Sequence, residues 1–393
     1  MRVAYFSPLP PQPSGIADYS ANLLSPLSAH CEITLFVDQP TVDLARLPAG
    51  LPVRSSAEFQ GPLREQFDMC LYQMGNNIRY HAQVYATLLR FPGIVVLHDP
   101  NLHAFYIDRA ARAAAPCIAF VREMAFAYGK EGAEYARQLF TAGGPRQDER
   151  YPLFTRLTQV SVGIILHSAY AQQMILRVCP AARTRVVQQP VPVLARTMSK
   201  TTAKEQLGLP PDALLLASFG YAAPNKHIHR VIDLLSRLRS IYPNLHYAVV
   251  GAAIPGYDLA ARVADLGLTE CVHLTGYIDQ ETYSKYLWAA DAGVNLRFPT
   301  NAETSAALLQ LMAAGIPTIV ADADAFHELP DAAVIKVKPD DAMSDRLAEA
   351  LAALLGDPLQ RAQVGAQAQH YIATQASPLN VAADYASFLQ NKI

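Results

Sequence analysis

Short runs of apolar residues recur along the chain, and stretches with apolar positions at helical spacing separate them. Such runs, rich in Val, Ile and Leu, are typical of strands covered on both faces, and their alternation with helices is typical of parallel sheets. The first series occupies residues 2–7, 32–37, 69–74, 93–98, 162–168 and 185–191. The second series occupies residues 214–220, 246–251, 271–276, 292–296, 317–322 and 333–337. The pattern predicts an α/β protein of two facing Rossmann-like domains.

A polar stretch punctuated by prolines, residues 192–210, separates the two series and predicts a linker. We therefore expect an N-terminal domain over residues 1–195 and a C-terminal domain over residues 196–393. Residues 381–390 form a terminal amphipathic pattern. We interpret it as a last helix that packs back on the first domain.

The first series is interrupted by a helical insertion over about residues 104–150. Residues 104–140 are rich in Ala with aromatic residues at helical spacing, and residues 141–152 have the Gly, Pro and charges of a loop. Arginines lie among the aromatic residues. Two interpretations remain open: a helical pair packed on its own domain, or a contact with a lipid at a membrane surface.

Composition narrows the class of protein. The chain has 393 residues with a formal net charge of -2, from 32 basic and 34 acidic residues, so we expect no nucleic-acid partner. Its five cysteines are scattered without a CxxC pair, which predicts neither a disulfide framework nor structural zinc and favours a reducing cytoplasm. The sequence contains no run of about 18 apolar residues, so we expect no membrane-spanning helix. The expected location is cytoplasmic, with peripheral contact at the inner face of the membrane left open.

Ligands of parallel sheets bind at the carboxyl ends of the strands, so the residues there are the candidates. In the first domain, Ser14 and Gly15 form a tight turn before a helix, which fits either a phosphate or sugar contact or an ordinary turn. His98 and Asp99 directly follow a strand, and His98 is interpreted either as a partner of a sugar hydroxyl or as a structural histidine. With His103 they give a spacing that does not place three metal ligands on one helical face, so no metal is predicted.

In the second domain, Lys226 is predicted at the start of a helix, where an ammonium group and the helix dipole both favour a diphosphate. The loop that ends in Glu303, Thr304 and Ser305 leads into another helix, whose first N–H groups can hold a phosphate. Gln310 lies seven residues after Glu303, a spacing that predicts a shared helical face. The alternative for each residue is ordinary capping chemistry or a solvated side chain.

Taken together, these segments resemble the retaining glycosyltransferases of family 4, which have the GT-B fold. The resemblance extends over nearly the whole chain and is strongest over residues 214–330. It is also carried by PSGIADYS (13–20), GNNIRYH (75–81), VVLHDPNLH (95–103) and LHSAY (166–170). Such enzymes often build bacterial surface polysaccharides.

The resemblance implies a role for each candidate residue. The catalytic residues would be His98 beside the donor sugar, Lys226 at the diphosphate and Glu303 at the sugar hydroxyls. The donor-binding residues would be Ser14, Gly15, Gly220, Tyr277, Thr304, Ser305 and Gln310. The acceptor-side residues would be Asp18, Asn76, Asp99 and His103.

The chain departs from the family pattern at three positions. Ala302 stands where the first of two glutamates is usual, so that Glu303 falls one residue late, and Gln310 replaces the second glutamate. Tyr221 stands where an arginine commonly precedes the lysine. An amide can still bind a ribose hydroxyl, but it is a weaker acceptor than a carboxylate. One positive charge fewer faces the diphosphate, unless Arg297 substitutes.

The resemblance therefore implies a retaining, metal-independent hexosyltransferase. It would move a sugar from a UDP- or GDP-type donor to a glycan or lipid-linked acceptor in polysaccharide biosynthesis, without a cofactor. Two alternatives remain open at this point: a GT-B-fold nucleotide-sugar epimerase, and a non-catalytic nucleotide-sugar-binding partner of an active transferase. The three departures from the family pattern motivate the second of these alternatives.

Overall fold

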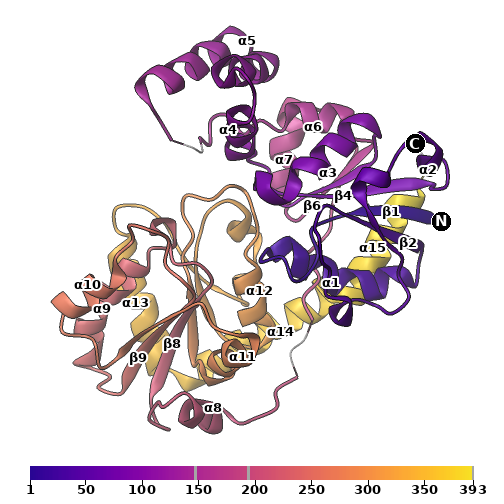
Figure 1. The fold of residues 1–393 in the computed structure, drawn as a ribbon. Coiled ribbons are helices and arrows are strands. Elements are labelled where there is room, and N and C mark those ends of the chain that lie inside the picture. The colour runs from indigo at the N-terminus through magenta and orange to yellow at the C-terminus, as the bar shows by residue number, and fades with distance from the viewer. Residues whose placement is uncertain (146–147, 193–194, 392–393) are drawn as a thin grey trace. The chain divides into compact units, whose positions relative to one another are not determined.

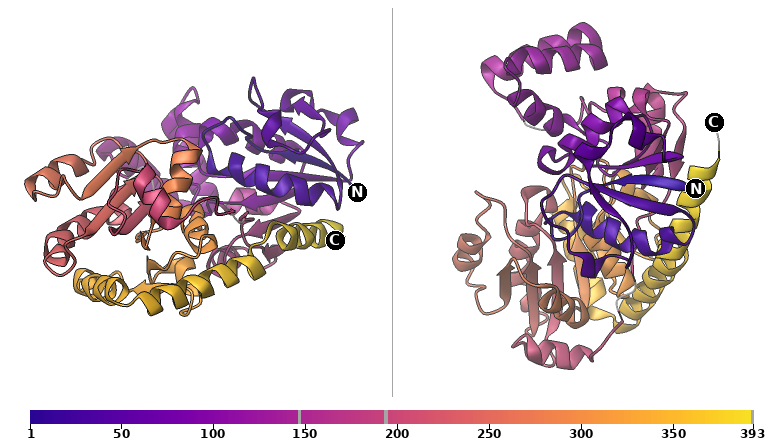
Figure 2. Two further views of the ribbon diagram at one scale, coloured as in Figure 1. Left: turned by 90° about the horizontal axis from the view of Figure 1, so that it is seen from below. Right: turned by 45° about the vertical axis from the view of Figure 1, so that its right-hand side comes forward.

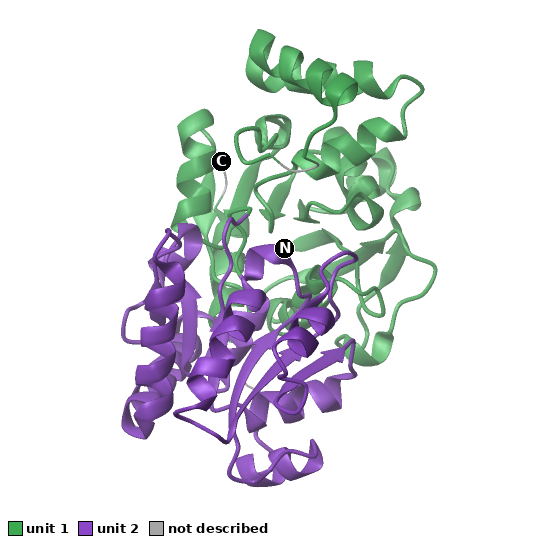
Figure 3. Cartoon of the chain, turned by 90° about the vertical axis from the view of Figure 1, so that its left-hand side faces the viewer, with its two compact units in different colours: residues 1–190, 301–304, 378–393 green, residues 191–300, 305–377 purple. Residues whose placement is uncertain are grey.

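The computed structural model describes residues 1–145, 148–192 and 195–391. The chain divides into two compact units, shown in Figure 3. Unit 1 consists of residues 1–190, 301–304 and 378–393, and unit 2 consists of residues 191–300 and 305–377. Residues 146 and 147 of the predicted insertion loop, and residues 193 and 194 of the predicted linker, lie outside the described residues.

Unit 1 is built on a parallel sheet of seven strands in the order β3-β2-β1-β4-β5-β6-β7. The strands are β1 (Arg2–Phe6), β2 (Glu32–Val37), β3 (Val53–Ser55), β4 (Met69–Met74), β5 (Ile94–Leu97), β6 (Gly163–Leu166) and β7 (Thr184–Val186). In the centre of the sheet, Tyr5 pairs with Leu35 on one side and with Leu71 on the other. Six of the seven strands coincide with predicted apolar runs, and β3 is the one that the pattern missed.

Helices cover both faces of this sheet, as Figures 1 and 2 show. They are α1 (Gly15–Ser28), α2 (Gly61–Arg64), α3 (Ile78–Arg90), α4 (His103–Ala111), α5 (Pro116–Ala142), α6 (Thr155–Val160), α7 (Ala169–Val178) and α15 (Pro378–Gln390), with short 3-10 turns η1 (Leu44–Arg46) and η2 (Ser56–Glu58). Helices α1 and α15 share one hydrophobic core with the sheet, and α3, α6 and α7 share the other. The C-terminal helix thus packs within unit 1 beside α1.

The segment between β5 and β6 contains α4, α5 and α6, and the first two lie where the sequence predicts a helical insertion. The helical backbone of α5 is interrupted at Gly129, whose φ of 62° suits a glycine. Phe105, Tyr106 and Phe120 are buried in the core that lies on the α3 side of the sheet. This packing supports the interpretation of the segment as helices attached to their own domain.

Unit 2 has a parallel sheet of six strands in the order β10-β9-β8-β11-β12-β13. The strands are β8 (Leu214–Phe219), β9 (Leu245–Val250), β10 (Val272–Gly276), β11 (Ala292–Asn295), β12 (Thr318–Ala321) and β13 (Ile335–Val337). The helices are α8 (Lys200–Gln206), α9 (Ile228–Arg239), α10 (Leu259–Asp265), α11 (Gln280–Ala289), α12 (Ala306–Ala313), α13 (Met343–Gly356) and α14 (Pro358–Gln375), with 3-10 turns η3 (Pro224–Lys226) and η4 (Asp324–Glu328). Helices α9, α10 and α13 pack on one face, and α8, α11, α12 and α14 on the other.

In both sheets the strand order reverses once, between β1 and β4 in unit 1 and between β8 and β11 in unit 2. At such a point the loops that leave neighbouring strands diverge, and this opens a place for a ligand at their carboxyl ends. The prediction of two Rossmann-like sheets in an α/β protein is confirmed. No helix among the described residues is long and apolar enough to cross a membrane.

Candidate functional site

In unit 1, the loop after β1 ends in a capped helix. The hydroxyl of Ser14 accepts a hydrogen bond from the N–H of Ile16 at 3.3 Å and so caps α1. A Cβ built on Gly15 would meet no atom within 4 Å, so this turn does not require a glycine for space. Asp18, predicted on the acceptor side, forms an ion pair with Arg46 at 2.9 Å on the surface. These contacts are those of an ordinary β–α turn.

The carboxyl ends of β4, β5 and β6 bring together three polar side chains, which we call the histidine column: Gln73, His98 and His167. His98 Nε2 lies 2.8 Å from Gln73 Oε1, and His98 Nδ1 lies 3.2 Å from His167 Nε2. His167 Nδ1 lies 2.8 Å from the carbonyl oxygen of Val187. All three side chains are buried. Both ring nitrogens of His98 are therefore engaged inside the protein.

Two tyrosines close the histidine column from the side of α1 and α15. The ring of Tyr19 stands edge-on to His98, with centroids 4.6 Å apart, and lies 5.3 Å from the ring of His167. The hydroxyl of Tyr19 hydrogen-bonds the hydroxyl of Tyr385 in the C-terminal helix. Burial raises the pKa of both phenols well above 10, so they stay protonated. The last helix of the chain therefore reaches the surroundings of His98.

The histidines in this region are neutral at pH 7. Burial lowers the pKa of His98 well below its usual value, and the neighbouring His167 lowers it further. Burial likewise lowers the pKa of His167 to about 4, against an opposing effect of its bond to Val187. The pKa of His81, which is buried nearby on α3, is lowered to about 4 for the same reason. Neutral imidazole rings at this position present hydrogen-bonding atoms rather than positive charge.

The three predicted acceptor-side residues after β4 and β5 hold loops together. Asp99 Oδ2 accepts from the N–H of Asn76 at 3.0 Å, and Asn76 Oδ1 accepts from the N–H of Phe105 at 2.8 Å. His103 begins α4 and is fully buried, with its ring 5.5 Å from that of Phe120. The structure thus brings Asn76 and Asp99 together, and it places His103 in a core rather than at the surface.

In unit 2, the turn after β8 brings Gly220 and Lys226 together. Gly220 has a φ of 84°, and Lys226 Nζ donates to the carbonyl of Phe219 at 3.1 Å. A Cβ on Gly220 would lie 3.0 Å from Lys226 Nζ. Lys226 was predicted at the start of a helix. It instead ends the turn η3, two residues before α9 begins at Ile228, because His227 adopts the left-handed conformation with a φ of 51° and interrupts the helix.

His227 joins the loop of Lys226 to the loop that follows β11. His227 Nε2 lies 2.8 Å from the carbonyl oxygen of Phe298, and the N–H of Phe298 donates to the carbonyl of Asn225 at 2.8 Å. A left-handed conformation is costly for a residue other than glycine, and such strain often marks a functional site. Arg297 immediately precedes Phe298, so these bonds fix the loop that carries it.

Residues 301–304 belong to unit 1, whereas Ser305 and the helix that follows belong to unit 2. Ser305 caps α12 by accepting from the N–H of Leu308 at 3.3 Å. Glu303 is buried, and its Oε2 accepts from the N–H of Asn301. Thr304 accepts from the side-chain amide of Gln189. The predicted helical face shared by Glu303 and Gln310 is wrong, because α12 begins only at Ala306 and Glu303 lies outside it.

The remaining predicted donor-binding residues of unit 2 differ in exposure. Gln310 accepts a hydrogen bond from the hydroxyl of Tyr283 and so already has a partner inside the unit. Tyr277 follows β10 and is 82% exposed, and Tyr221 follows Gly220 and is 61% exposed. Two aromatic side chains thus stand free at strand ends of this sheet, one of them at the position of the missing arginine.

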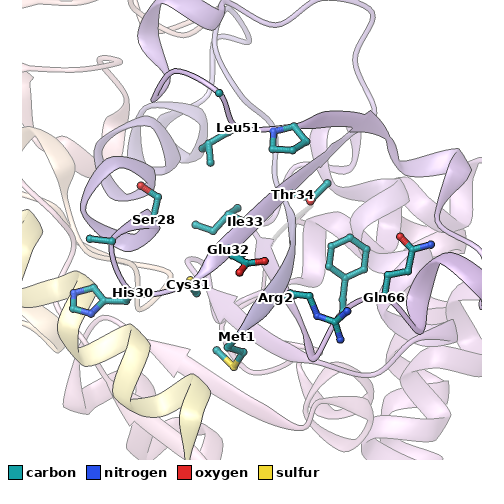
Figure 4. A pocket seen from close by; sticks show the side chains of 14 residues that line it. Met1, Arg2, Ser28, His30, Cys31, Glu32, Ile33, Thr34, Leu51 and Gln66 are labelled. Atoms are coloured by element: carbon teal, nitrogen blue, oxygen red, sulfur yellow. The ribbon is translucent and has the colours of Figure 1, made fainter.

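A surface pocket of unit 1, about 740 Å³, lies elsewhere. It is formed around the amino ends of β1 and β2, with Arg2, Glu32 and Gln66 among its lining residues, as Figure 4 shows. Arg2 is engaged there by Asp68 at 3.0 Å. This is the sheet edge opposite the strand ends at which ligands of parallel sheets bind. Within the described residues, no group of three His, Cys, Asp or Glu side chains is arranged to hold a metal ion.

Several residues of the histidine column and its surroundings were not predicted from the sequence, among them Gln73, His167 and Tyr385. His167 was part of the LHSAY segment but received no role, although its position at the end of β6 was a usable signal. Tyr385 carried no such signal, because its partner Tyr19 lies 366 residues away in the chain. His227 was also passed over, since nothing in its sequence context indicates a left-handed backbone.

Comparison with protein families gives one match. Residues 199–371 match the family described as "Glycosyl transferases group 1". This range lies largely within unit 2 and includes Lys226, Tyr277 and Gln310. No curated protein matches the sequence.

Solved structures with a similar fold extend over the whole chain. The structure of Anabaena Alr3699/HepE in complex with UDP-glucose has a TM-score of 0.68 at 16% identity, covering 100% of both chains. Sucrose-phosphate synthase from Thermosynechococcus elongatus has a TM-score of 0.66 at 17% identity, covering 98% of both. WaaG, a glycosyltransferase involved in lipopolysaccharide biosynthesis, has a TM-score of 0.61 at 16% identity, covering 99% of this chain and 100% of its own. The chain thus has the GT-B fold.

Proposed function

We propose that this protein is a glycosyltransferase that takes its sugar from a nucleotide diphosphate donor. The observation that carries the proposal is the match of residues 199–371 to a glycosyltransferase family, over the unit in which Lys226 lies at a strand switch point. UDP-sugars are the first donors to test, because HepE was solved with UDP-glucose. Unit 2 would bind most of the nucleotide diphosphate, and unit 1 would bind the acceptor.

Transfer of a sugar from a diphosphate depends chiefly on stabilising the charges that develop in the transition state. When the bond between the sugar carbon and the phosphate oxygen breaks, positive charge develops on the sugar and negative charge on the departing diphosphate. Lys226 would stabilise that negative charge with its ammonium group, which the turn at Gly220 holds beside the end of β8. Arg297, on the loop tied to it through His227 and Phe298, would supply the second positive charge that Tyr221 does not. Neutralisation by these side chains would need neither a metal nor a cofactor.

The finer features of the proposal follow the family resemblance. The sugar would be a hexose, and its anomeric configuration would be retained. The acceptor hydroxyl would approach from the face that the diphosphate leaves and would give its proton to a phosphate oxygen. The acceptor would be a glycan or a lipid-linked glycan of a surface polysaccharide, reached in the cytoplasm or at the inner face of the membrane. Glu303, Thr304 and Ser305 would bind the donor at the start of α12, and Tyr277 would lie near the base.

A ligand screen tests the proposal. The melting temperature of the purified protein is measured with UDP, GDP, ADP and dTDP and with their sugars. A ligand at a hundredfold excess over its dissociation constant stabilises the native state by about 2.7 kcal/mol. We expect UDP compounds to raise the melting temperature of the wild type and of Lys130→Ala, an exposed lysine of α5, but not of Lys226→Ala.

Release of nucleotide from the donor is then measured with the ligand that binds. Release above background by the wild type, reduced in Lys226→Ala, supports an enzyme. Binding without release or transfer to any acceptor would instead indicate a non-catalytic nucleotide-sugar-binding protein. Isomerised donor would indicate an epimerase. A protein that no nucleotide stabilises would contradict the proposal for unit 2.

A further inference from the structure

We propose that His167 is a positioning residue, which fixes the tautomer of His98 so that His98 Nε2 can accept a hydrogen bond from a sugar hydroxyl. The role in sugar binding rests on the proposed function, whereas the control of the tautomer does not. The LHSAY segment, to which the sequence assigned no chemistry, supplies this residue at the end of β6.

The number of hydrogens on the ring nitrogens limits the hydrogen bonds that the histidine column can form. Val187 at one end offers only a carbonyl oxygen, so His167 Nδ1 must carry a hydrogen and donate to it. If Gln73 also offers its oxygen at the other end, the column contains three hydrogen bonds and needs three ring N–H groups. Two neutral imidazoles carry only two hydrogens. The column therefore either holds one additional proton or receives a hydrogen from Gln73.

Burial decides between these two arrangements. The lowered pKa values of His98 and His167 keep both rings neutral at pH 7. Gln73 Nε2 is buried and has no hydrogen-bond partner among the described residues, and the two ends of an amide are nearly indistinguishable by shape. Turning the amide makes Gln73 the donor and completes all three bonds. The neutral column then has a single arrangement of hydrogens.

In that arrangement every direction of donation follows from Val187. His167 Nδ1 donates to Val187, so the neutral His167 has a bare Nε2 that accepts from His98 Nδ1. His98 is then the Nδ1–H tautomer, and its Nε2 is an acceptor that faces the Gln73 amide. The edge-on ring of Tyr19 holds the ring plane of His98. His167 thus sets which nitrogen of His98 carries the hydrogen.

The tautomer determines the chemistry that His98 offers to a ligand. A bare Nε2 accepts a hydrogen bond from a hydroxyl group, whereas its lone pair repels a phosphate oxygen. A sugar hydroxyl could replace the Gln73 amide at this atom by exchanging one hydrogen bond for another, with no net proton transfer. The inferred ligand at this end of unit 1 is therefore the sugar part of a substrate rather than its diphosphate.

The tautomer is measured directly by nitrogen NMR of histidine side chains in the full-length protein at pH 7.5. We expect the wild type to show neutral His98 with hydrogen on Nδ1. His167→Phe removes the acceptor, and the His98 signal should lose this signature. His167→Gln keeps an oxygen acceptor within reach and should restore it. The matched control is His273→Phe, which breaks the other close histidine pair, His246 Nδ1 to His273 Nε2 at 3.0 Å, in unit 2.

Nucleotide release from the donor gives the second readout. In His167→Phe we expect kcat to fall on the order of tenfold, because an interaction with the reacting sugar is weakened. KM should change less than kcat, since Lys226 is proposed to hold the diphosphate. Neither constant should change in His273→Phe.

Several outcomes would overturn the inference. They are a wild-type His98 with hydrogen on Nε2, a protonated His98 at pH 7.5, or a tautomer that is the same in His167→Phe. If His167→Phe does not fold, the wild-type spectrum and the His167→Gln variant still decide. A wild type with the expected tautomer but no nucleotide release would leave the control by His167 standing and contradict the proposed function instead.

Discussion

Each unit buries a polar cluster at the ends of its strands, and the cluster is neutral in unit 1 and charged in unit 2. Unit 1 places neutral rings in the histidine column, at the carboxyl ends of its strands. Unit 2 buries an ion cluster at the amino end of β11, where Asp291 accepts from Lys200 and from Lys204 at 2.8 Å each, and from the N–H of Leu215 at 2.9 Å. A hydrogen bond between neutral groups can be replaced by a hydrogen bond to a ligand at little cost. A buried ion pair cannot be broken in this way without leaving a charge unpaired.

The contrast predicts two separate responses to acid. In unit 1, a histidine whose folded pKa lies below its unfolded value destabilises the fold as the pH drops below that unfolded value. In unit 2, burial raises the pKa of Asp291, but Lys200 and the Leu215 N–H outweigh it and hold the pKa below the usual 3.8. The stability that Asp291 contributes is present above pH 3.8 and is lost as the pH falls towards its folded pKa. Acid should therefore act on the buried histidines of unit 1 at a higher pH than on Asp291 of unit 2.

The largest effect is expected for Asp291→Ala in unit 2. The substitution leaves the buried ammonium of Lys204 without its carboxylate, and breaking a buried ion pair in this way costs about 3–5 kcal/mol. Urea denaturation at pH 7.5 measures the loss. The control is Asp233→Ala, which breaks an exposed pair with Arg262 and should cost less than about 1 kcal/mol. Equal costs for the two variants would contradict the role given to the buried cluster.

The next effect concerns His81, which is buried on α3 and lies in no proposed site. Its pKa rises from about 4 in the folded protein to 6.5 on unfolding, so it should remove about 2 kcal/mol of stability between pH 7.5 and pH 5. We expect His81→Leu to show a smaller loss over this range than the wild type, by urea denaturation at both pH values. His30→Leu, at an exposed histidine, should keep the wild-type dependence. A His81→Leu variant whose stability depends on pH as strongly as that of the wild type would contradict the effect assigned to the burial of His81.

Much of the fold could be predicted from the sequence, because buried strands leave a strong local signal. Each central strand is an apolar run, as in β4 and β9. The edge strand β3 was missed because Val53 is only partly buried, Arg54 and Ser55 are exposed, and the three residues form no apolar run. Helix boundaries depend on the caps, as at Ser14, whose hydroxyl caps α1 so that the helix already begins at Gly15, a residue predicted to lie in the turn.

The candidate site was less predictable, since it depends on contacts between distant segments. His98 could be found because it follows a strand, and strand ends are known in advance to face ligands. Its partners Gln73 and His167 come from two other strands, and only the sheet order places them beside it. The seven-residue spacing of Glu303 and Gln310 led to a wrong prediction. Such a spacing places two side chains on one face only when both lie in the same helix, and α12 begins between them.

A smaller effect should follow from the tyrosine pair that joins α1 to the C-terminal helix. Tyr385→Phe leaves the buried hydroxyl of Tyr19 without its partner, at a cost of about 1–2 kcal/mol. Tyr19→Phe should cost a similar amount, and the double variant should cost less than the sum of both. Urea denaturation of the three variants gives the coupling energy. Strict additivity would show that the two hydroxyl groups do not stabilise each other.

The smallest effect separates the backbone of the Lys226 turn from its chemistry. Gly220 and Gly256 share a φ of 84°, but only a Cβ at Gly220 would contact another side chain, Lys226 Nζ at 3.0 Å. Gly220→Ala and Gly256→Ala should therefore each cost about 1 kcal/mol of stability from the left-handed backbone. Only Gly220→Ala should also displace the ammonium group and weaken the binding of a nucleotide diphosphate. Titration of both variants with UDP measures this. If both variants bind UDP as tightly as the wild type, the position of Lys226 beside Gly220 does not determine the binding of the diphosphate. Arg297 or the start of α12 would then have to bind it.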